Sequence, residues 1–142
     1  MVPGDSNQEI LKLQDLTGPQ TQKIALGTPE TAPAGRYAKE VLEKAGLWQE
    51  LTPRFVFTQS VRQSLGHVFR NEVDAGIVYA TDAAMSPVKV RTALEVPLDH
   101  PIVYPIGAVK GFGNENGALR FIAFVRSEGG QAILAKYGFL KP

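Results

Sequence analysis

The chain has 142 residues, a net charge of +1 at neutral pH and 20% charged residues, with Lys and Arg scattered along it. Because it lacks the clustered basic residues of a nucleic-acid surface, we expect no nucleic-acid partner. Hydrophobic residues make up 44% of the chain, enough for a packed core, and the absence of cysteine excludes disulfides and thiolate metal sites. No apolar run has the length of a membrane span.

The first part of the chain predicts a strand followed by a helix. Residues 9–16 (EILKLQDL) can form one or two helical turns, and residues 23–29 (KIALGTP) are a short apolar run that predicts a buried strand. Apolar residues then recur with helical spacing from Tyr37 to Ala45, and Gly46 ends this helix. Residues 46–51 predict a further turn.

This helix has an unusual beginning. The fixed φ of Pro33 suits the first helical position, which places Ala32 at the N-cap, where it offers no side-chain acceptor. The amides of Ala34 and Gly35 are then expected to lack a local partner. Amides at the positive end of a helix bind either water or an anion, and the pattern of residues alone leaves both open.

A second junction of the same kind follows. Residues 54–58 (RFVFT) predict a strand, and the next helix begins with Ser60 and Gln63 spaced as a capping box. A capping box satisfies the amides of the N-cap and the third helical residue but leaves those of Val61 and Arg62 free. Two such junctions at one sheet edge strengthen the case for a shared anion site, but helix caps hydrated by solvent stay the preferred interpretation of the residues alone.

Three further strands and two helices complete the prediction. Residues 74–80, 90–97 and 101–111 predict strands, and residues 116–139 predict two closing helices. The succession βαβαβ predicts an α/β fold with a doubly wound parallel sheet, whose ligands bind beyond the carboxyl ends of the strands. Tyr79 lies near such an end, where its hydroxyl could donate to a ligand or remain in water.

Other chemistry finds little support in the sequence. Ser64 and His67 are spaced to touch on one helix, but no acid or oxyanion hole accompanies them, so we do not expect a hydrolase. No spacing of carboxylates and histidines suggests a metal site.

Four stretches together show a family resemblance. Residues 25–48, 60–83, 102–111 and 124–139 closely resemble the periplasmic molybdate-binding proteins, the substrate-binding components of molybdate ABC transporters. The motifs occur in the family's order with similar spacing. The resemblance implies a non-enzymatic protein without cofactor, located in the periplasm, that binds molybdate or tungstate and delivers it to a transporter permease.

The resemblance also identifies oxyanion-binding residues. Ala34 and Val61 match backbone amide donors, and Tyr79 matches a phenolic donor. These are positions that the helix starts and the strand end had already indicated. No metal ligand is implied beyond the metal oxyanion itself.

Family members have a type II periplasmic-binding-protein fold with two lobes around the ligand. By resemblance, residues 1–103 form the second lobe with its crossing strand, and residues 104–142 form a strand and helices that return toward the first lobe. The family's amino-terminal segment, which builds much of the first lobe, has no counterpart in this sequence.

The missing segment would cover the closing helices in members of the family. The apolar face of the closing helices needs a partner, so we expect self-association or completion by a first lobe. This face consists of Ala118, Phe121, Ile122, Val125, Ile133, Leu134 and Tyr137.

Two alternatives to transport stay open. One is an effector-sensing domain of a regulator, and the other is a truncated lobe with little ligand binding of its own.

Overall fold

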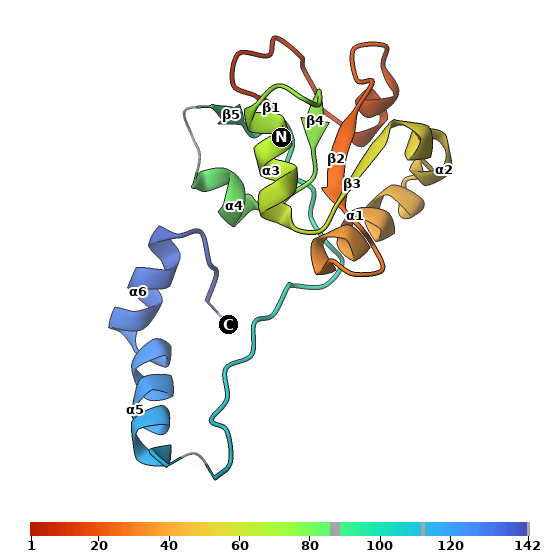
Figure 1. Ribbon diagram of the computed structural model, residues 1–142. Coiled ribbons are helices and arrows are strands. Elements are labelled where there is room, and N and C mark those ends of the chain that lie inside the picture. Colours follow the sequence, from red (N-terminus) through yellow and green to blue (C-terminus); the bar gives the residue numbers. More distant parts are fainter. Residues whose placement is uncertain (86–88, 112, 142) are drawn as a thin grey trace. The chain divides into compact units, whose positions relative to one another are not determined.

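The computed structural model describes residues 1–85, 89–111 and 113–141. The chain divides into two compact units, Met1–Leu98 and Asp99–Pro142. Within the described part, no helix is both long and apolar enough to cross a membrane. Figure 1 shows the elements of both units.

A three-stranded parallel sheet is the centre of the first unit. Strand β2 (Ile24–Gly27) lies between β3 (Phe55–Thr58) and β4 (Ala75–Gly76). In the register, Ile24 is the partner of both Phe55 and Ala75. The predicted strands at 23–29 and 54–58 and their parallel pairing are thus confirmed, whereas the predicted strand 74–80 has only two residues in the sheet.

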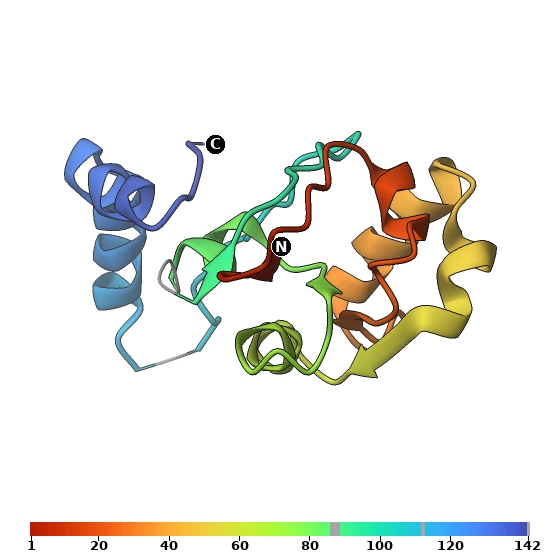
Figure 2. The ribbon, with the colours of Figure 1, turned by 90° about the horizontal axis from the view of Figure 1, so that it is seen from above.

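Helices cover both faces of this sheet. Helix α1 (Pro33–Lys44) precedes the short α2 (Trp48–Leu51) and the 3-10 turn η2 (Thr52–Arg54), and α3 (Val61–Phe69) follows β3. Figure 2 shows α3, in green, and α1, in orange, on different sides of the parallel strands. This is the doubly wound arrangement expected from the alternation of strands and helices.

Local chemistry accounts for the bounds of α1. Ala32 is its N-cap without a side-chain hydrogen bond, and Pro33 is its first residue, as predicted. Gly46, with φ of 73°, takes the left-handed conformation just beyond the helix that other residues disfavour.

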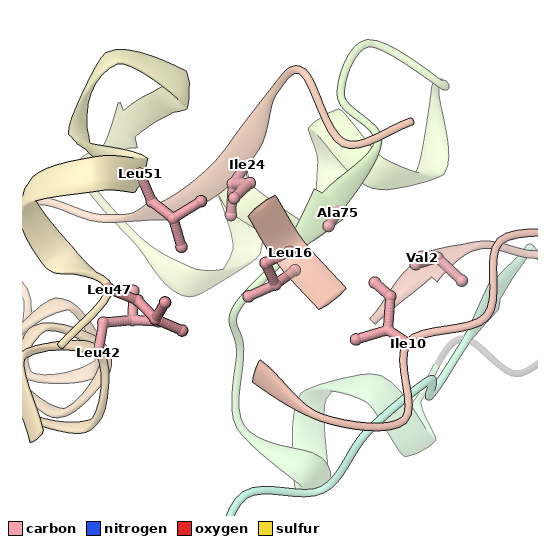
Figure 3. Packing of buried hydrophobic residues seen from close by; sticks show 8 residues of the cluster. All are labelled: Val2, Ile10, Leu16, Ile24, Leu42, Leu47, Leu51 and Ala75. Carbon is pink, nitrogen blue, oxygen red and sulfur yellow. The ribbon is translucent and has the colours of Figure 1, made fainter. Parts of the chain in front are cut away.

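The larger core cluster joins α1 and α2 to one face of the sheet. Leu42 of α1 and Leu51 of α2 are fully buried together with Ile24 of β2. Figure 3 shows these side chains with the remaining members of the cluster, Val2, Ile10, Leu16, Leu47 and Ala75. On the other face Ala25 packs with Val68 of α3, so consecutive residues of β2 serve opposite layers.

The last two strand predictions have different outcomes. The strand predicted at 90–97 is confirmed only for β5 (Val90–Arg91), which pairs antiparallel with β1 (Val2–Pro3) in a separate two-stranded sheet and not in the parallel sheet. The strand predicted at 101–111 is wrong, because these residues contain no strand. Pro101 and Pro105 lack an amide hydrogen for a ladder, and the described residues of the second unit include no strand with which this segment could pair.

Two short helical elements complete the first unit. The 3-10 helix η1 (Leu13–Thr17) takes the place of the helical turns predicted at 9–16. Helix α4 (Ala80–Ala84), which the sequence analysis did not predict, begins directly after Tyr79.

The second unit contains the two predicted closing helices, α5 (Glu115–Arg126) and α6 (Glu128–Lys136). Asn114 and Ser127 are their N-caps, and each side chain accepts a hydrogen bond from an amide of the first turn. No residue of α5 is buried, and Phe121 is 59% exposed. The helices therefore form without burying their apolar side chains within this unit.

The amino group of Met1 joins the two sheets of the first unit. It donates a hydrogen bond to the Gly76 carbonyl at 2.9 Å, and the Gly76 amide donates to the Met1 carbonyl at 2.9 Å. Burial, assisted by the charge of Arg91, lowers the pKa of this amino group to about 6. The protonated amine is therefore less stable in the fold than in the unfolded chain.

This pKa shift predicts a pH dependence of stability. Since the folded-state pKa lies below the unfolded value of 8.0, the cost is complete below pH 6 and disappears as the pH rises to 8. We expect the free energy of unfolding, measured by urea denaturation, to rise by about 2 to 3 kcal/mol over this range. An N-terminally acetylated chain keeps an N–H donor without the charge and should lack this rise. An equal rise in both forms would contradict the assignment to Met1.

Candidate functional site

Helices α1 and α3 both begin at the carboxyl edge of the parallel sheet, one after β2 and one after β3 (Figure 1). The carboxyl ends of β2 and β3 are tied together, because the amide and the hydroxyl of Thr28 both donate to the Thr58 carbonyl, at 2.8 and 3.1 Å. The sheet thereby brings the two predicted helix starts to one side of the unit.

At the start of α1, the amide of Ala34 has no acceptor among the described residues. The residue itself is buried. The expectation for Gly35 was wrong, since its amide donates to the Ala32 carbonyl at 2.9 Å. A buried amide without a protein partner is uncommon, and a bound anion or water satisfies such a donor.

At the start of α3, the cap differs from the predicted capping box in one bond. Ser60 accepts from the Gln63 amide at 3.3 Å, as expected. The Gln63 side chain, however, accepts from the Gln59 amide at 3.0 Å and not from that of Ser60. In the described structure the successive amides of Ser60, Val61 and Arg62 therefore have no acceptor.

Tyr79 is the N-cap residue of α4 and lies three residues beyond β4. Its ring meets that of Tyr37 in α1 edge to face, with centroids 6.5 Å apart. Helix α4 packs on α3, and Arg62 of α3 is close enough to Asp82 of α4 to affect its pKa. Burial raises that pKa and the charge of Arg62 opposes the increase. Tyr79 is thus placed beside both helices.

A close approach of backbones seats α1 against β2. A Cβ atom at Gly35 would lie 2.1 Å from the Gly27 carbonyl oxygen and 2.6 Å from its carbon. Only glycine allows this contact, because backbone atoms cannot move aside as a flexible side chain can. The first turn of α1 is therefore held directly on the end of the central strand.

The side chains of the Ser64 and His67 pair have other partners, so the structure gives no support to hydrolytic chemistry. Ser64 is fully buried with its hydroxyl 2.7 Å from that of Thr58. His67 Nδ1 lies 2.6 Å from Glu72, which also accepts two bonds from Arg70. The bonds from Arg70, followed by that from His67, lower the pKa of Glu72 to about 2. Over the described residues no group of three potential metal ligands occurs.

The α/β fold, with helices on both faces of a parallel sheet, is that of a solute-binding protein. The chain belongs to the bacterial extracellular solute-binding protein family, whose model matches residues 1–140. Members of this family bind solutes and are not enzymes. The family resemblance found in the sequence is therefore confirmed.

Two relatives show how much of such a protein the chain represents. It is 40% identical over 98% of its length to YvgL of Bacillus subtilis, named as an ABC transporter substrate-binding lipoprotein. It is 35% identical over 92% of its length to the molybdate-binding protein ModA of Haemophilus influenzae. These alignments cover 53% and 52% of the relatives, so the chain spans about half their length.

Solved structures agree in fold. A substrate-binding domain from Clostridium difficile, assigned to a molybdenum ABC transporter, superposes with a TM-score of 0.79 at 32% identity, covering 94% of this chain and 58% of that one. The periplasmic molybdate-binding protein of Azotobacter vinelandii shares the fold with a TM-score of 0.73 at 22% identity, covering 99% of this chain and 62% of that one.

The contact between α1 and β2 predicts the effect of two glycine substitutions. Gly35→Ala should lower the free energy of unfolding by at least about 3 kcal/mol, the upper end of overpacking costs, because its methyl group meets backbone. Gly66→Ala in α3 is the matched control. Its methyl group meets only the flexible Arg70 guanidinium, so stability should stay equal or rise by up to about 1 kcal/mol. Urea denaturation measures both, and equal stability of the two variants would contradict the seating of α1 on β2.

Proposed function

We propose that this protein binds molybdate or tungstate as part of an ABC-transporter substrate-binding protein, in the periplasm, and delivers the oxyanion to a permease. The observation that carries the proposal is the pair of helix starts with unpaired amides, at Ala34 and Val61, at one sheet edge. Relatives named as molybdate-binding proteins support this choice of ligand.

The proposed recognition uses neutral donors. Preorganised amides at helix ends replace the hydration shell of a doubly charged oxyanion with little rearrangement. Donors without acceptors favour a fully deprotonated oxyanion over protonated phosphate, and in this proposal the difference in ligand size separates molybdate and tungstate from the smaller sulfate. Arg36 and Arg62 lie near the helix starts and add long-range attraction without direct contact.

The described lobe provides only part of the coordination in this proposal. Each hydrogen bond to a charged group contributes roughly 1.5 to 3 kcal/mol, so the lobe alone should bind more weakly than a two-lobed protein by several kcal/mol. A lobe with little affinity of its own is the second candidate, favoured by the coverage of about half of each relative.

Tyr79 provides the side-chain donor in this proposal. Tyr79→Phe keeps the ring and removes the hydroxyl, so molybdate affinity measured by calorimetric titration should fall by roughly 1 to 3 kcal/mol. Tyr37→Phe is the matched control, because the Tyr37 ring contacts that of Tyr79 but its hydroxyl has no role in the proposed site. A Tyr79→Phe variant with unchanged affinity would remove this residue from the site, and absence of molybdate binding by the parent chain would favour the second candidate.

The exposed apolar residues of the second unit need a packing partner. Large apolar side chains of α5 and α6 are exposed, including Phe121, Phe124 and Ile133. Leaving such side chains in water costs about 1.5 to 3 kcal/mol each relative to burial. We propose that they pack against elements equivalent to the part of the relatives that this chain does not match, and against a second copy of the chain when those elements are absent.

Light scattering at micromolar concentration tests this packing. The chain should form dimers or larger species, because association covers the exposed face of α5 and α6. Phe121→Ser combined with Ile133→Ser should reduce association, whereas Leu11→Ser, at a residue 76% exposed in the first unit, should leave it unchanged. A compact monomer that binds little hydrophobic dye would contradict the proposal.

A further inference from the structure

Thr58 is the last residue of β3 and stands between the two helix starts. Its side chain is buried, with 2% of the residue exposed. Both its carbonyl and its hydroxyl make hydrogen bonds, and these bonds lead to different helices.

The carbonyl of Thr58 positions the start of α1. It accepts from the amide and hydroxyl of Thr28, and the Thr28 carbonyl in turn accepts from the amides of Thr31 and Ala32. Ala32 is the N-cap of α1, so a continuous chain of hydrogen bonds leads from β3 to the turn that presents the Ala34 amide.

The hydroxyl of Thr58 positions the start of α3. It lies 2.7 Å from the Ser64 hydroxyl, 3.1 Å from the Ser60 carbonyl and 3.2 Å from the Leu26 carbonyl. Since a hydroxyl has a single hydrogen, Thr58 donates to only one of these three oxygens, and either hydroxyl can be the donor between Thr58 and Ser64. This side chain links the end of β2, the N-cap of α3 and the fourth residue of α3.

We infer that Thr58 is a positioning residue that fixes the amides at Ala34 and Val61 relative to each other, an inference that rests on the proposed oxyanion site. An array of rigid donors selects its ligand only when the donors are held within roughly 0.5 Å of their productive positions. A small shift of one helix start therefore weakens binding and reduces discrimination between oxyanions of different size, even though Thr58 itself does not touch the ligand.

Two substitutions distinguish positioning from ordinary stabilisation. Thr58→Val keeps the shape and the carbonyl but removes the hydroxyl, and Thr58→Ser retains the hydroxyl. Thr21→Val is the matched control, because Thr21 is a fully buried threonine whose hydroxyl accepts from the Gln8 side chain, away from both helix starts.

The first measurement needs no ligand. In nuclear magnetic resonance spectra of the ligand-free chain, Thr58→Val should shift the amide resonance of Val61, because the lost hydroxyl holds the start of α3, and Thr58→Ser should restore it. The Ala34 resonance should stay where it is, because the retained Thr58 carbonyl positions the start of α1. Thr21→Val should lower stability to a similar extent without moving either resonance. An unchanged Val61 resonance in Thr58→Val would overturn the inference, whether or not the chain binds an oxyanion.

The second measurement connects positioning to binding. In calorimetric titrations, Thr58→Val should weaken molybdate binding about tenfold and reduce the preference for molybdate over sulfate, and Thr21→Val should change neither. Unaltered affinity and preference in Thr58→Val, with clear binding by the parent chain, would also overturn the inference. No binding by the parent chain, combined with shifted resonances, would favour the second candidate, a lobe with little affinity of its own, and leave the positioning role supported.

Discussion

Burial of both faces of β2 is the constraint on which the rest of the first unit depends. Ile24, Ala25 and Leu26 are all fully buried, and alternate side chains of a strand point to opposite faces. One face needs α1 and α2, and the other needs α3, so the chain must return across both faces of the sheet. Parallel strands require such crossovers, and α1 and α3 therefore begin at the carboxyl edge.

This edge concentrates backbone donors. A helix start leaves several amides without partners inside the helix, and side-chain caps satisfy only some of them. At α3 the cap satisfies Gln63 and leaves three amides before it, and at α1 the N-cap alanine has no side-chain acceptor, so the Ala34 amide stays without a partner among the described residues. The proposed oxyanion site is thus a consequence of how the chain enters its helices, with Tyr79 as an added side-chain donor. Thr58 is buried between the two helix starts, and we infer that it fixes the amides of one start in position relative to those of the other.

The second unit is organised differently. Its helices are well capped and make regular backbone hydrogen bonds, but they leave several large apolar residues exposed, among them Phe121, Phe124 and Ile133. Helices of this length gain most of their stability from packing an apolar face, which requires a partner surface.

Some features of the fold depend only on neighbours a few residues away, and local patterns in the sequence determined them. They are the strands 23–29 and 54–58, the helices from Pro33, Ser60 and Asn116, the cap at Ala32 and the free amide at Val61. The placement of Ala34, Val61 and Tyr79 in the ligand site came from family resemblance, and that placement stays a prediction. Tertiary structure decided what depends on distant partners. Residues 101–111 lack a strand to pair with, and 90–97 pairs through only two residues with the chain's beginning. The role of Thr58 could not be predicted either, since its hydrogen bonds to Leu26, Thr28 and Ser64 exist only after the sheet has assembled.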